Sequence, residues 1–441
     1  MARRGAGGGA KGEPVAAARH AALRALQRVG QGARSELALA TEAPADARDR
    51  ALCWHLVCGT LQHRGELDFL IERLAKRPIT RIEPLILDLL RMALFELRCG
   101  RAPAHAVVHQ AVALARAGGQ PWAAGFVNAV LRAHGRADIS LPELASSNHP
   151  AWLLERWMAR YGRDAALAWA RRNNEPAPLC VALHRDPDGA RRALEGQGLE
   201  LVPATAAGEP IAGLWWIHGP TGPVEDLPGA GRDFWVQDPA AAAVVDLLDA
   251  EPGARVLDAC AAPGGKTLRL ASQGAEVLAV DRSPARLDTL RAALHQAGLG
   301  AEVALHDWTV GPLPGGEAPA LFDGVLVDAP CTGLGTTRRH PEIRWRREEA
   351  DLTRAAALQL RILLATARHV APGGALVYAV CSPEPEEGEG VVADFLRERT
   401  GFALERTWSS APPRGDEDAF WGARLRRAER LEAGDKRLEK T

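Results

Sequence analysis

The spacing of apolar residues divides the chain into a helical first part and a mixed later part. From about residue 15 to 135, apolar residues recur three and four positions apart, as in "AARHAALRALQRV" and "IEPLILDLLRMALFEL". This period is typical of amphipathic helices that pack against one another. We therefore predict an all-α bundle over residues 15–140, preceded by a flexible tail at residues 1–14.

After residue 236 the pattern changes to short apolar runs that alternate with amphipathic helices. The expected strands are "RVLDA", "AEVLAV", "AEVALHD", "FDGVLVDAP" and "GALVYAVCS". Strands that alternate with helices predict a doubly wound α/β sheet, parallel at its centre, over residues 236–423. Sheets of this class bind ligands at the carboxyl ends of their strands. The fold class expected for the whole chain is therefore α followed by α/β.

Two further segments complete the division of the chain. Residues 141–235 contain a helical pair, a Pro-rich stretch, a short helix and a run dense in Gly and Pro, and we interpret them as a small mixed subdomain and connector. Residues 424–441, "RLRRAERLEAGDKRLEKT", read as a charged tail that is either helical or disordered.

Charge is unevenly distributed along the chain. The formal net charge is −1, yet residues 1–140 hold 20 Lys and Arg against 12 Asp and Glu, which gives this part a charge of +8. An excess of this size is compatible with binding nucleic acid, and a solvated helical surface is the alternative.

Cysteine usage and hydropathy indicate a cytoplasmic protein with free thiols. The seven cysteines are an odd number and lack the paired spacing of a disulfide framework or a zinc site. No apolar run approaches the roughly 20 residues that cross a bilayer. The first basic residues are not followed by the apolar core of a signal peptide. We expect no metal, because His306 and His340 have no accompanying ligand cluster.

The first three strand ends suggest a nucleoside-containing cofactor. "VLDACAAPGGKT" runs from a strand through Gly264 and Gly265 into a helix, where backbone N–H groups can approach a ligand closely. Asp281 ends the next strand, at the distance along the chain where a carboxylate grips ribose hydroxyls. Asp307 ends the third. A tight turn and a helix cap are the simpler readings of each feature alone.

The fourth and fifth strand ends each carry a cysteine. Cys331 follows Asp328 in "DAPC", and Cys381 ends "ALVYAVC", so both thiols can meet over one cleft. A thiolate that adds to carbon 6 of a pyrimidine makes carbon 5 nucleophilic, and a second group must then remove the carbon 5 proton. Asp328 is placed to stabilise the adduct near ring nitrogen 3.

These motifs resemble the RNA 5-methylcytosine methyltransferases that use S-adenosylmethionine. The resemblance rests on "DACAAPGGKT", "AVDRSPARL", "VDAPCTGLGTTRRHPEIRW" and "YAVCSPEPEE", in the family's order. It implies a Rossmann-like domain in which Cys381 is the nucleophile and Cys331 assists release. It assigns the cofactor to Cys260, Ala261, Ala262, Pro263, Gly264, Gly265, Lys266, Asp281, Asp307 and Asp328.

The first part of the chain resembles the NusB-like RNA-binding domain, through "RDRALCWHLVCGTLQHRGELDFLI", "HAVVHQAVALA" and "GFVNAVLR". This domain ahead of the catalytic core is the arrangement of the bacterial RsmB (Sun) type. It implies a monomer that methylates small-subunit (16S) ribosomal RNA before full assembly. The sequence departs from the family pattern at Val380 (usually Thr), at Gly388 (usually Asn) and in "LCVA" at 179–182 (usually "LRVN").

A basic segment after Cys331 is a candidate RNA contact. An enzyme that extracts a base from RNA needs phosphate contacts and stacking surfaces, and a solvated loop is the alternative. The predicted RNA-binding residues are Arg338, Arg339, His340, Arg344 and Trp345.

Three other functions stay open at this point. The substrate can be another RNA such as tRNA. The chain can be a ribosomal RNA-binding assembly factor with weakened catalysis, given its altered motifs. A small-molecule methyltransferase of the same fold is the third alternative, although it would need neither a basic helical domain nor paired thiols.

Overall fold

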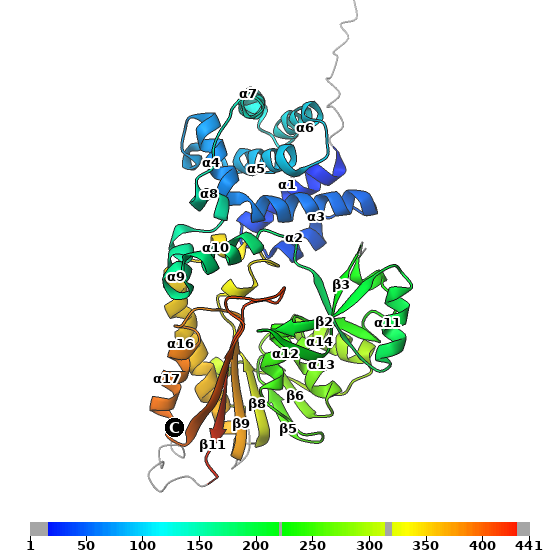
Figure 1. The fold of residues 1–441 in the computed structure, drawn as a ribbon, viewed down its shortest axis with the longest axis vertical. Coiled ribbons are helices and arrows are strands. Elements are labelled where there is room, and N and C mark those ends of the chain that lie inside the picture. The colour runs from blue at the N-terminus through cyan, green and yellow to red at the C-terminus, as the bar shows by residue number, and fades with distance from the viewer. Residues whose placement is uncertain (1–15, 220–222, 314–319, 430–441) are drawn as a thin grey trace, which may run out of the picture. The chain divides into compact units, whose positions relative to one another are not determined.

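The computed structural model describes residues 16–219, 223–313 and 320–429 (Figure 1). The chain divides into two units. The helical unit runs to Glu175 and also contains the segment 338–346; the sheet unit contains residues 176–337 and those from 347 onward. The segment 338–346 therefore belongs to the helical unit, although the residues before and after it in the sequence belong to the sheet unit. The predicted tail at 1–14 and residues 430–441 lie outside the described residues.

The helical unit consists of α-helices and two short 3-10 helices. They are α1 (Ala17–Gly30), α2 (Ser35–Glu42), α3 (Ala47–Gln62), α4 (Arg64–Ala75), η1 (Ile79–Arg81), α5 (Pro84–Cys99), α6 (Ala104–Ala117), η2 (Pro121–Ala123), α7 (Ala124–His134), α8 (Glu143–Ser147), α9 (Ala151–Tyr161), α10 (Arg163–Arg172) and α15 (Ile343–Arg346). The predicted all-α bundle is confirmed.

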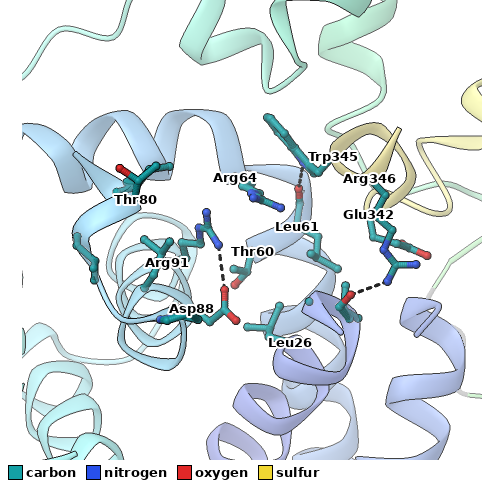
Figure 2. A pocket seen from close by; sticks show the side chains of 16 residues that line it. Leu26, Thr60, Leu61, Arg64, Thr80, Asp88, Arg91, Glu342, Trp345 and Arg346 are labelled. Carbon is teal, nitrogen blue, oxygen red and sulfur yellow. Dashed lines mark hydrogen bonds and ion pairs between the residues drawn. The ribbon is translucent and has the colours of Figure 1, made fainter. Parts of the chain in front are cut away.

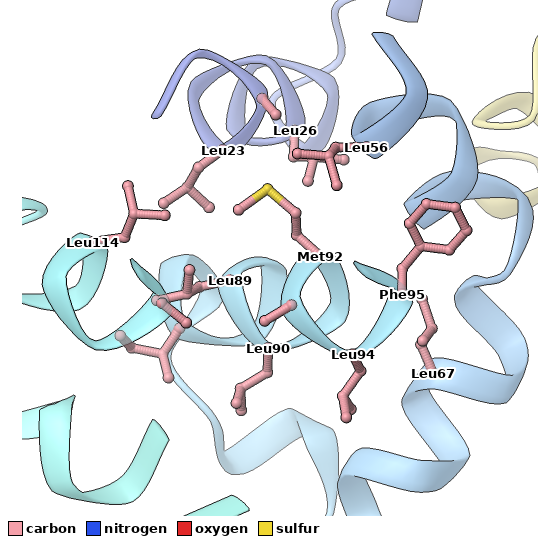
Figure 3. Packing of buried hydrophobic residues seen from close by; sticks show 14 of the residues in the cluster. Leu23, Leu26, Leu56, Leu67, Leu89, Leu90, Met92, Leu94, Phe95 and Leu114 are labelled. Atoms are coloured by element: carbon pink, nitrogen blue, oxygen red, sulfur yellow. The ribbon is translucent and has the colours of Figure 1, made fainter. Parts of the chain in front are cut away.

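Helix α5 forms the centre of this bundle. It begins with Pro84 in the first turn and with the Glu83 carboxylate accepting the N–H of Ile86 at 3.0 Å, a capping arrangement that fixes its start. Its apolar residues are buried against α1 and α3 (Figure 3). Phe95 packs on α3 at Gly59, where an added Cβ would lie 1.9 Å from the ring, so only glycine fits.

Helices α8 to α10 also belong to the helical unit. The indole rings of Trp157 and Trp169 stack with centroids 3.9 Å apart, and Asn148 accepts the N–H of Glu66 on α4 at 2.9 Å. The prediction that residues 141–235 form one subdomain is therefore wrong. These aromatic and polar contacts attach the helical pair to the bundle, and the division of the chain falls between Glu175 and Pro176.

The sheet unit contains two sheets and the helices around them. Its strands are β1 (Leu179–Leu183), β2 (Glu200–Ala206), β3 (Glu209–His218), β4 (Phe234–Val236), β5 (Arg255–Asp258), β6 (Glu276–Asp281), β7 (Glu302–Leu305), β8 (Phe322–Asp328), β9 (Val370–Val380), β10 (Phe402–Ser409) and β11 (Trp421–Arg427). Its helices are α11 (Pro187–Glu195), η3 (Val224–Asp226), α12 (Pro239–Asp246), α13 (Gly265–Ser272), α14 (Pro284–Ala297), η4 (Trp308–Val310), η5 (Leu334–Thr336), α16 (Glu349–Thr366), η6 (Ala367–His369) and α17 (Glu389–Glu398).

The larger sheet has seven strands in the order β10-β11-β9-β8-β5-β6-β7. Strands β5 to β9 pair parallel with one another, and β11 pairs antiparallel with β9 and β10. The five predicted strands are confirmed, and so is a parallel centre. The smaller sheet is antiparallel, in the order β2-β3-β1-β4.

Alternate residues of the central strands supply two cores, one on each face of the larger sheet. Along β9, Val377 and Ala379 belong to one cluster, and Leu376, Tyr378 and Val380 belong to the other. Helices α12 to α14 cover the first face, and α16 and α17 cover the second (Figure 1). Because these strands are parallel, the carboxyl ends of β5, β6, β8 and β9 lie at one edge of the sheet.

The charged tail predicted from residue 424 begins later than expected. Strand β11 continues to Arg427 and pairs with β9 as far as Arg426. Leu425 is fully buried, and Arg424 and Arg426 each donate to the Glu405 carboxylate at 2.8 Å. Strand pairing and these ion pairs outweigh the charge of the segment. None of the helices in the described ranges is long and apolar enough to cross a membrane.

Candidate active site

The loop between β5 and α13 carries the glycines. Gly264 precedes α13 with a φ of 127°, and an added Cβ would lie 2.6 Å from Cδ1 of Leu290. A side chain at this position is therefore excluded by conformation and by space. The N–H of Ala261 donates to the carbonyl of Val280 at 2.9 Å, and Arg286 donates to the carbonyl of Ala262. These contacts fix the loop and leave its backbone open to close approach at the start of α13.

Two of the predicted aspartates take different local roles. Asp281, at the end of β6, is 4% exposed and accepts the N–H groups of Ala262 at 3.2 Å and Ser283 at 2.9 Å. It therefore joins the glycine loop to the end of the next strand. Asp307 accepts the N–H of Thr309 at 2.9 Å and caps η4, and this hydrogen bond lowers the pKa of its carboxyl.

Asp258, at the end of β5, was not among the predicted site residues. It is fully buried, and burial raises the pKa of its carboxyl to about 7. Thr267 donates to Oδ2 at 2.7 Å, whereas the buried Oδ1 has no hydrogen-bond partner among the described residues. This orphaned acceptor suits a ligand that brings hydrogen-bond donors, as S-adenosylmethionine does with its ammonium and hydroxyl groups. Its place at a strand end was the available sequence signal.

Lys266 forms an ion pair with Asp328. Its ammonium donates to Oδ2 at 2.7 Å and lies 5.2 Å from the ring centroid of Phe420. Burial alone would lower the pKa of Lys266, but the Asp328 carboxylate outweighs burial and the pKa is raised. Attraction to Cys381 contributes to the same shift. The structure thus brings Lys266, Asp328 and Cys381 close together, although they lie on three separate segments of the sequence.

The two predicted thiols meet. Sγ of Cys331, after β8, lies 3.1 Å from Sγ of Cys381, after β9. This separation exceeds the roughly 2.05 Å of a disulfide, and all seven cysteines are free. The hydrogen bond with Cys381, together with burial, raises the pKa of Cys331 well above its ordinary value. Cys331 therefore keeps its proton to higher pH than an ordinary thiol does.

Both parts of the chain match known families. A family model described as 16S rRNA methyltransferase RsmB/F matches residues 245–421, and one described as the NusB family matches residues 16–136. A ribosomal RNA small subunit methyltransferase B from Thermus thermophilus is 36% identical over 92% of this chain and 96% of its own. The protein of the same name from Serratia proteamaculans is 34% identical over 86% of this chain and 90% of its own.

The chain belongs to the RsmB/F family of 16S rRNA methyltransferases. The predicted class is thereby confirmed, an S-adenosylmethionine-dependent RNA methyltransferase of the cytosine-5 type with a NusB domain.

Solved structures agree on the fold. A crystal structure of the protein PH0851 superposes with a TM-score of 0.79 over 94% of this chain and 99% of its own, at 24% identity. A methyltransferase homologue from Pyrococcus horikoshii gives a TM-score of 0.54 over 65% of this chain and 97% of its own, also at 24% identity.

The RsmB/F pattern is altered at two positions where the structure explains the residue present. Val380 is fully buried in the core beside α16 and α17 and pairs with Trp421 of β11. Gly388 lies against the same indole, where an added Cβ would be 2.9 Å from Cδ2 of Trp421. A large ring therefore fills the space that a longer side chain at 388 would need. In "LCVA", Cys180 and Ala182 are buried in β1.

The predicted RNA contact of Arg344 is wrong, because this side chain lies inside the helical unit. It is fully buried and donates to the carbonyls of Asn148 at 3.2 Å and Asn173 at 2.9 Å, and to Oδ1 of Asn174 at 2.7 Å. Burial lowers its pKa to about 9. A guanidinium binds backbone carbonyls as readily as phosphate, and sequence alone does not separate the two cases.

The neighbours of Arg344 are held in the same unit. Arg338 is 8% exposed and donates to the carbonyl of Glu175 at 3.3 Å, which also contradicts an RNA contact. The indole of Trp345 donates to the carbonyl of Leu61 at 3.0 Å. Arg339 and His340 are half-buried and stay predicted contacts.

A cavity of about 460 Å³ lies within the helical unit (Figure 2). It was not predicted, and it contains none of the strand-end residues. Thr60, Arg64, Arg91, Glu342 and Trp345 are among its polar and aromatic lining residues. The Arg64 guanidinium lies 5.3 Å from the ring centroid of Trp345, and Arg91 is bound to Asp68 and Asp88.

Proposed function

We propose that this protein methylates carbon 5 of a cytosine in 16S ribosomal RNA through a covalent bond between Cys381 and carbon 6. The observation that carries this proposal is the pair of thiols 3.1 Å apart, at the ends of two adjacent parallel strands. The raised pKa of Cys331 makes the two sulfurs chemically unequal. Cys331 holds its proton more tightly than an ordinary thiol, which leaves Cys381 as the proposed nucleophile.

The addition step uses Cys381. Its thiolate electron pair forms the bond to carbon 6, and the electrons of the carbon 5–carbon 6 double bond move to make carbon 5 nucleophilic. Bound S-adenosylmethionine supplies the methyl group to carbon 5. Negative charge develops near ring nitrogen 3 in this step, and the Lys266–Asp328 pair supplies the proton that neutralises it, with Lys266 also holding Asp328 in place.

The release step uses Cys331. Once the sulfur of Cys381 is bonded to carbon, the hydrogen bond and the charge by which it raises the pKa of Cys331 are weakened, so Cys331 releases its proton to solvent more readily. Its thiolate then takes the proton from carbon 5, the double bond re-forms, and the Cys381 thiolate leaves with its electron pair. The same contact thus keeps Cys331 protonated before addition and frees it afterwards.

The proposed cofactor residues lie at or just after the carboxyl ends of β5, β6, β7 and β8 in the sheet unit. Asp281 binds the glycine loop at the N–H of Ala262, and Asp258 offers its free Oδ1. We assign the cofactor to Cys260 through Lys266 with Asp258, Asp281, Asp307 and Asp328. These residues would hold the ribose hydroxyls and the charged amino-acid end.

The substrate assignment to 16S ribosomal RNA rests on the family and on charge. The curated relatives are named for the ribosomal RNA small subunit. The excess of 20 basic over 12 acidic residues in positions 1–140, which include the NusB match, suits phosphate contacts. We propose that the chain acts in the cytoplasm, as a monomer, on RNA that is not yet fully assembled.

Transfer of labelled methyl groups tests the proposal. The purified protein should label 16S ribosomal RNA from cells that lack the enzyme, and bisulfite sequencing should then locate a protected cytosine. Ribosomal RNA that already carries the modification, and unmodified tRNA, are the controls. Labelling of tRNA alone would overturn the substrate, and no labelling by folded protein would favour an assembly factor without catalysis.

A further inference from the structure

A fully buried carboxylate joins the two loops that carry the thiols. Glu387 has no exposed surface. Its Oε1 accepts the backbone N–H of Thr332 at 2.8 Å and the amide of Gln359 at 2.9 Å. Its Oε2 accepts the hydroxyls of Ser382 at 2.6 Å and of Thr332. Thr332 follows Cys331 and Ser382 follows Cys381, so a single side chain binds the residue after each thiol.

Two buried polar side chains, Tyr378 and Gln359, hold Glu387 in place. Tyr378 and Gln359 are fully buried. The Tyr378 hydroxyl contacts the carbonyl of Glu387 and Oε1 of Gln359, and Gln359 also donates to the carbonyl of Pro330 at 3.1 Å. Every carboxylate oxygen of Glu387 is satisfied, which is the condition under which a buried polar network rigidifies its surroundings.

The two thiols depend on this network to different degrees. Cys381 directly follows strand β9, whose last residue, Val380, is still paired with β11. Cys331 lies beyond the last ladder contact of β8, the N–H of Ala329 with the carbonyl of Ala379. Further along the chain, the backbone N–H of Gly335 donates a hydrogen bond to the carbonyl of Cys381 at 3.0 Å. Between Ala329 and Gly335, side chains supply the hydrogen bonds that hold the loop, including Arg347 to the carbonyl of Thr332 at 2.9 Å.

We propose that Glu387 is the positioning residue that sets Cys331 against Cys381. It acts on the release step, because its loss frees the Cys331 loop while the β9 ladder still holds Cys381. This inference rests on the proposed covalent function. It assigns a role to a residue that is fully buried beneath the two loops.

The carboxylate also contributes charge. Around Cys331, the titratable groups are Cys381, Asp328, Glu387 and Tyr378, and Lys266 faces Asp328. After the hydrogen bond with Cys381 and burial, the charges of Glu387 and Asp328 further raise the pKa of Cys331. Removal of the Glu387 charge should therefore move the ionisation of Cys331 to lower pH.

Three variants separate anchoring from charge. Glu387→Ala removes both. Glu387→Gln removes the charge but keeps anchoring, because its amide oxygen can take the place of Oε1 and the hydroxyls of Thr332 and Ser382 can turn to accept from its NH₂ group. Thr332→Val removes one hydroxyl contact and keeps the backbone N–H. Glu389→Gln is the matched control, since Glu389 is an exposed glutamate two residues away.

The experiment follows a single turnover on unmodified 16S ribosomal RNA with labelled S-adenosylmethionine. Denaturing gels measure the amount of RNA-linked protein. The amount of methylated RNA that is no longer linked to protein measures the release step. Glu387→Ala should slow release by about 10²-fold, as a small misplacement of a reacting group does, and the adduct should accumulate. Thr332→Val should show a weaker form of the same defect. Glu387→Gln should release close to the wild-type rate, with its pH profile displaced to lower pH, and Glu389→Gln should match wild type.

Two results would overturn the role of Glu387. One is a Glu387→Ala protein with wild-type release and no extra adduct. The other is a variant that forms no adduct, which would place Glu387 in addition. If Glu387→Ala does not fold, the release rate of Thr332→Val and the pH profile of Glu387→Gln test the proposal instead. Wild-type behaviour of both variants would overturn it. Failure of the covalent function itself is distinguishable, because wild type would then form no adduct on the pathway.

Discussion

The ends of β8 and β9 carry the same chemical group and hold it in different ways. Cys381 directly follows a strand that is paired with β8 on one side and β11 on the other. Cys331 lies in a loop whose nearest contacts come from the side chains of Glu387, Gln359 and Arg347. Val380, beside the Cys381 thiol, is held by backbone pairing with Trp421. A side-chain network depends on the identity of each member.

The largest effect should come from the thiol held by backbone. Cys381→Ala removes the nucleophile, so methyl transfer should fall by roughly 10³-fold or more. Cofactor binding, measured by calorimetry, should survive because the glycine loop is unchanged. Cys99→Ala, an exposed thiol of the helical unit, is the control. Comparable loss in both variants would contradict the assignment.

A second substitution tests the other strand end. Lys266→Met removes the ammonium, and with it the ion pair with Asp328 and the cation–π contact with Phe420. If Asp328 acts on the ring, its misplacement should slow transfer by about 10²-fold, in the range of acid–base contributions. Rapid-quench kinetics measure the chemical step. Lys266→Arg should restore part of the rate. Equal rates for Lys266→Met and wild type would show that Lys266 has no role in the chemical step.

A third substitution disturbs the network through its backbone. Gly388→Ala brings a Cβ to 2.9 Å from Trp421, so the chain next to Glu387 must shift. We expect the sheet unit to lose about 1–3 kcal/mol of stability, the usual cost of overpacking. Gly300→Ala, where nothing lies within 4 Å of an added Cβ, is the control for thermal unfolding. Equal melting of the two variants would show that Trp421 yields easily.

The last effect is on stability as a function of pH and concerns Asp258, at the end of β5. Its pKa is raised from 3.8 to about 7 by burial, so the folded chain holds a proton that the unfolded chain releases in this interval. The stability that this proton gives is complete below the lower pKa and is lost as pH rises through the higher one.

Asp258→Asn cannot titrate. Its stability relative to wild type should therefore rise between about pH 4 and 8, as measured by urea unfolding. Asp307→Asn is the opposite case, because the pKa of Asp307 is lowered. An identical pH trend in both variants would refute the assignment.

Much of the candidate site was predictable from sequence because its signals are local. Strand period and strand-end residues located Asp281, Asp328, Cys331 and Cys381, and the structure brings both thiols together. Glu387 had no such signal. It is one of several glutamates in "SPEPEEGE", and only the folded chain shows which of them is buried.

The limits of sequence were clearest where one residue type serves two purposes. The basic segment after Cys331 looked like an RNA contact, yet Arg344 binds carbonyls inside the helical unit. Similarly, Arg424 and Arg426 looked like a solvated tail and are part of β11. In both cases long-range partners decide the role of the charge, and these partners are distant in sequence.

Adduct formation by two single variants tests the division of labour most directly. Cys331→Ala and Cys381→Ala are each mixed with unmodified 16S ribosomal RNA and S-adenosylmethionine and run on a denaturing gel. The account predicts a slow-migrating RNA-linked band for Cys331→Ala, which adds but does not release, and none for Cys381→Ala. The reverse pattern, or normal turnover by Cys331→Ala without a band, would contradict it.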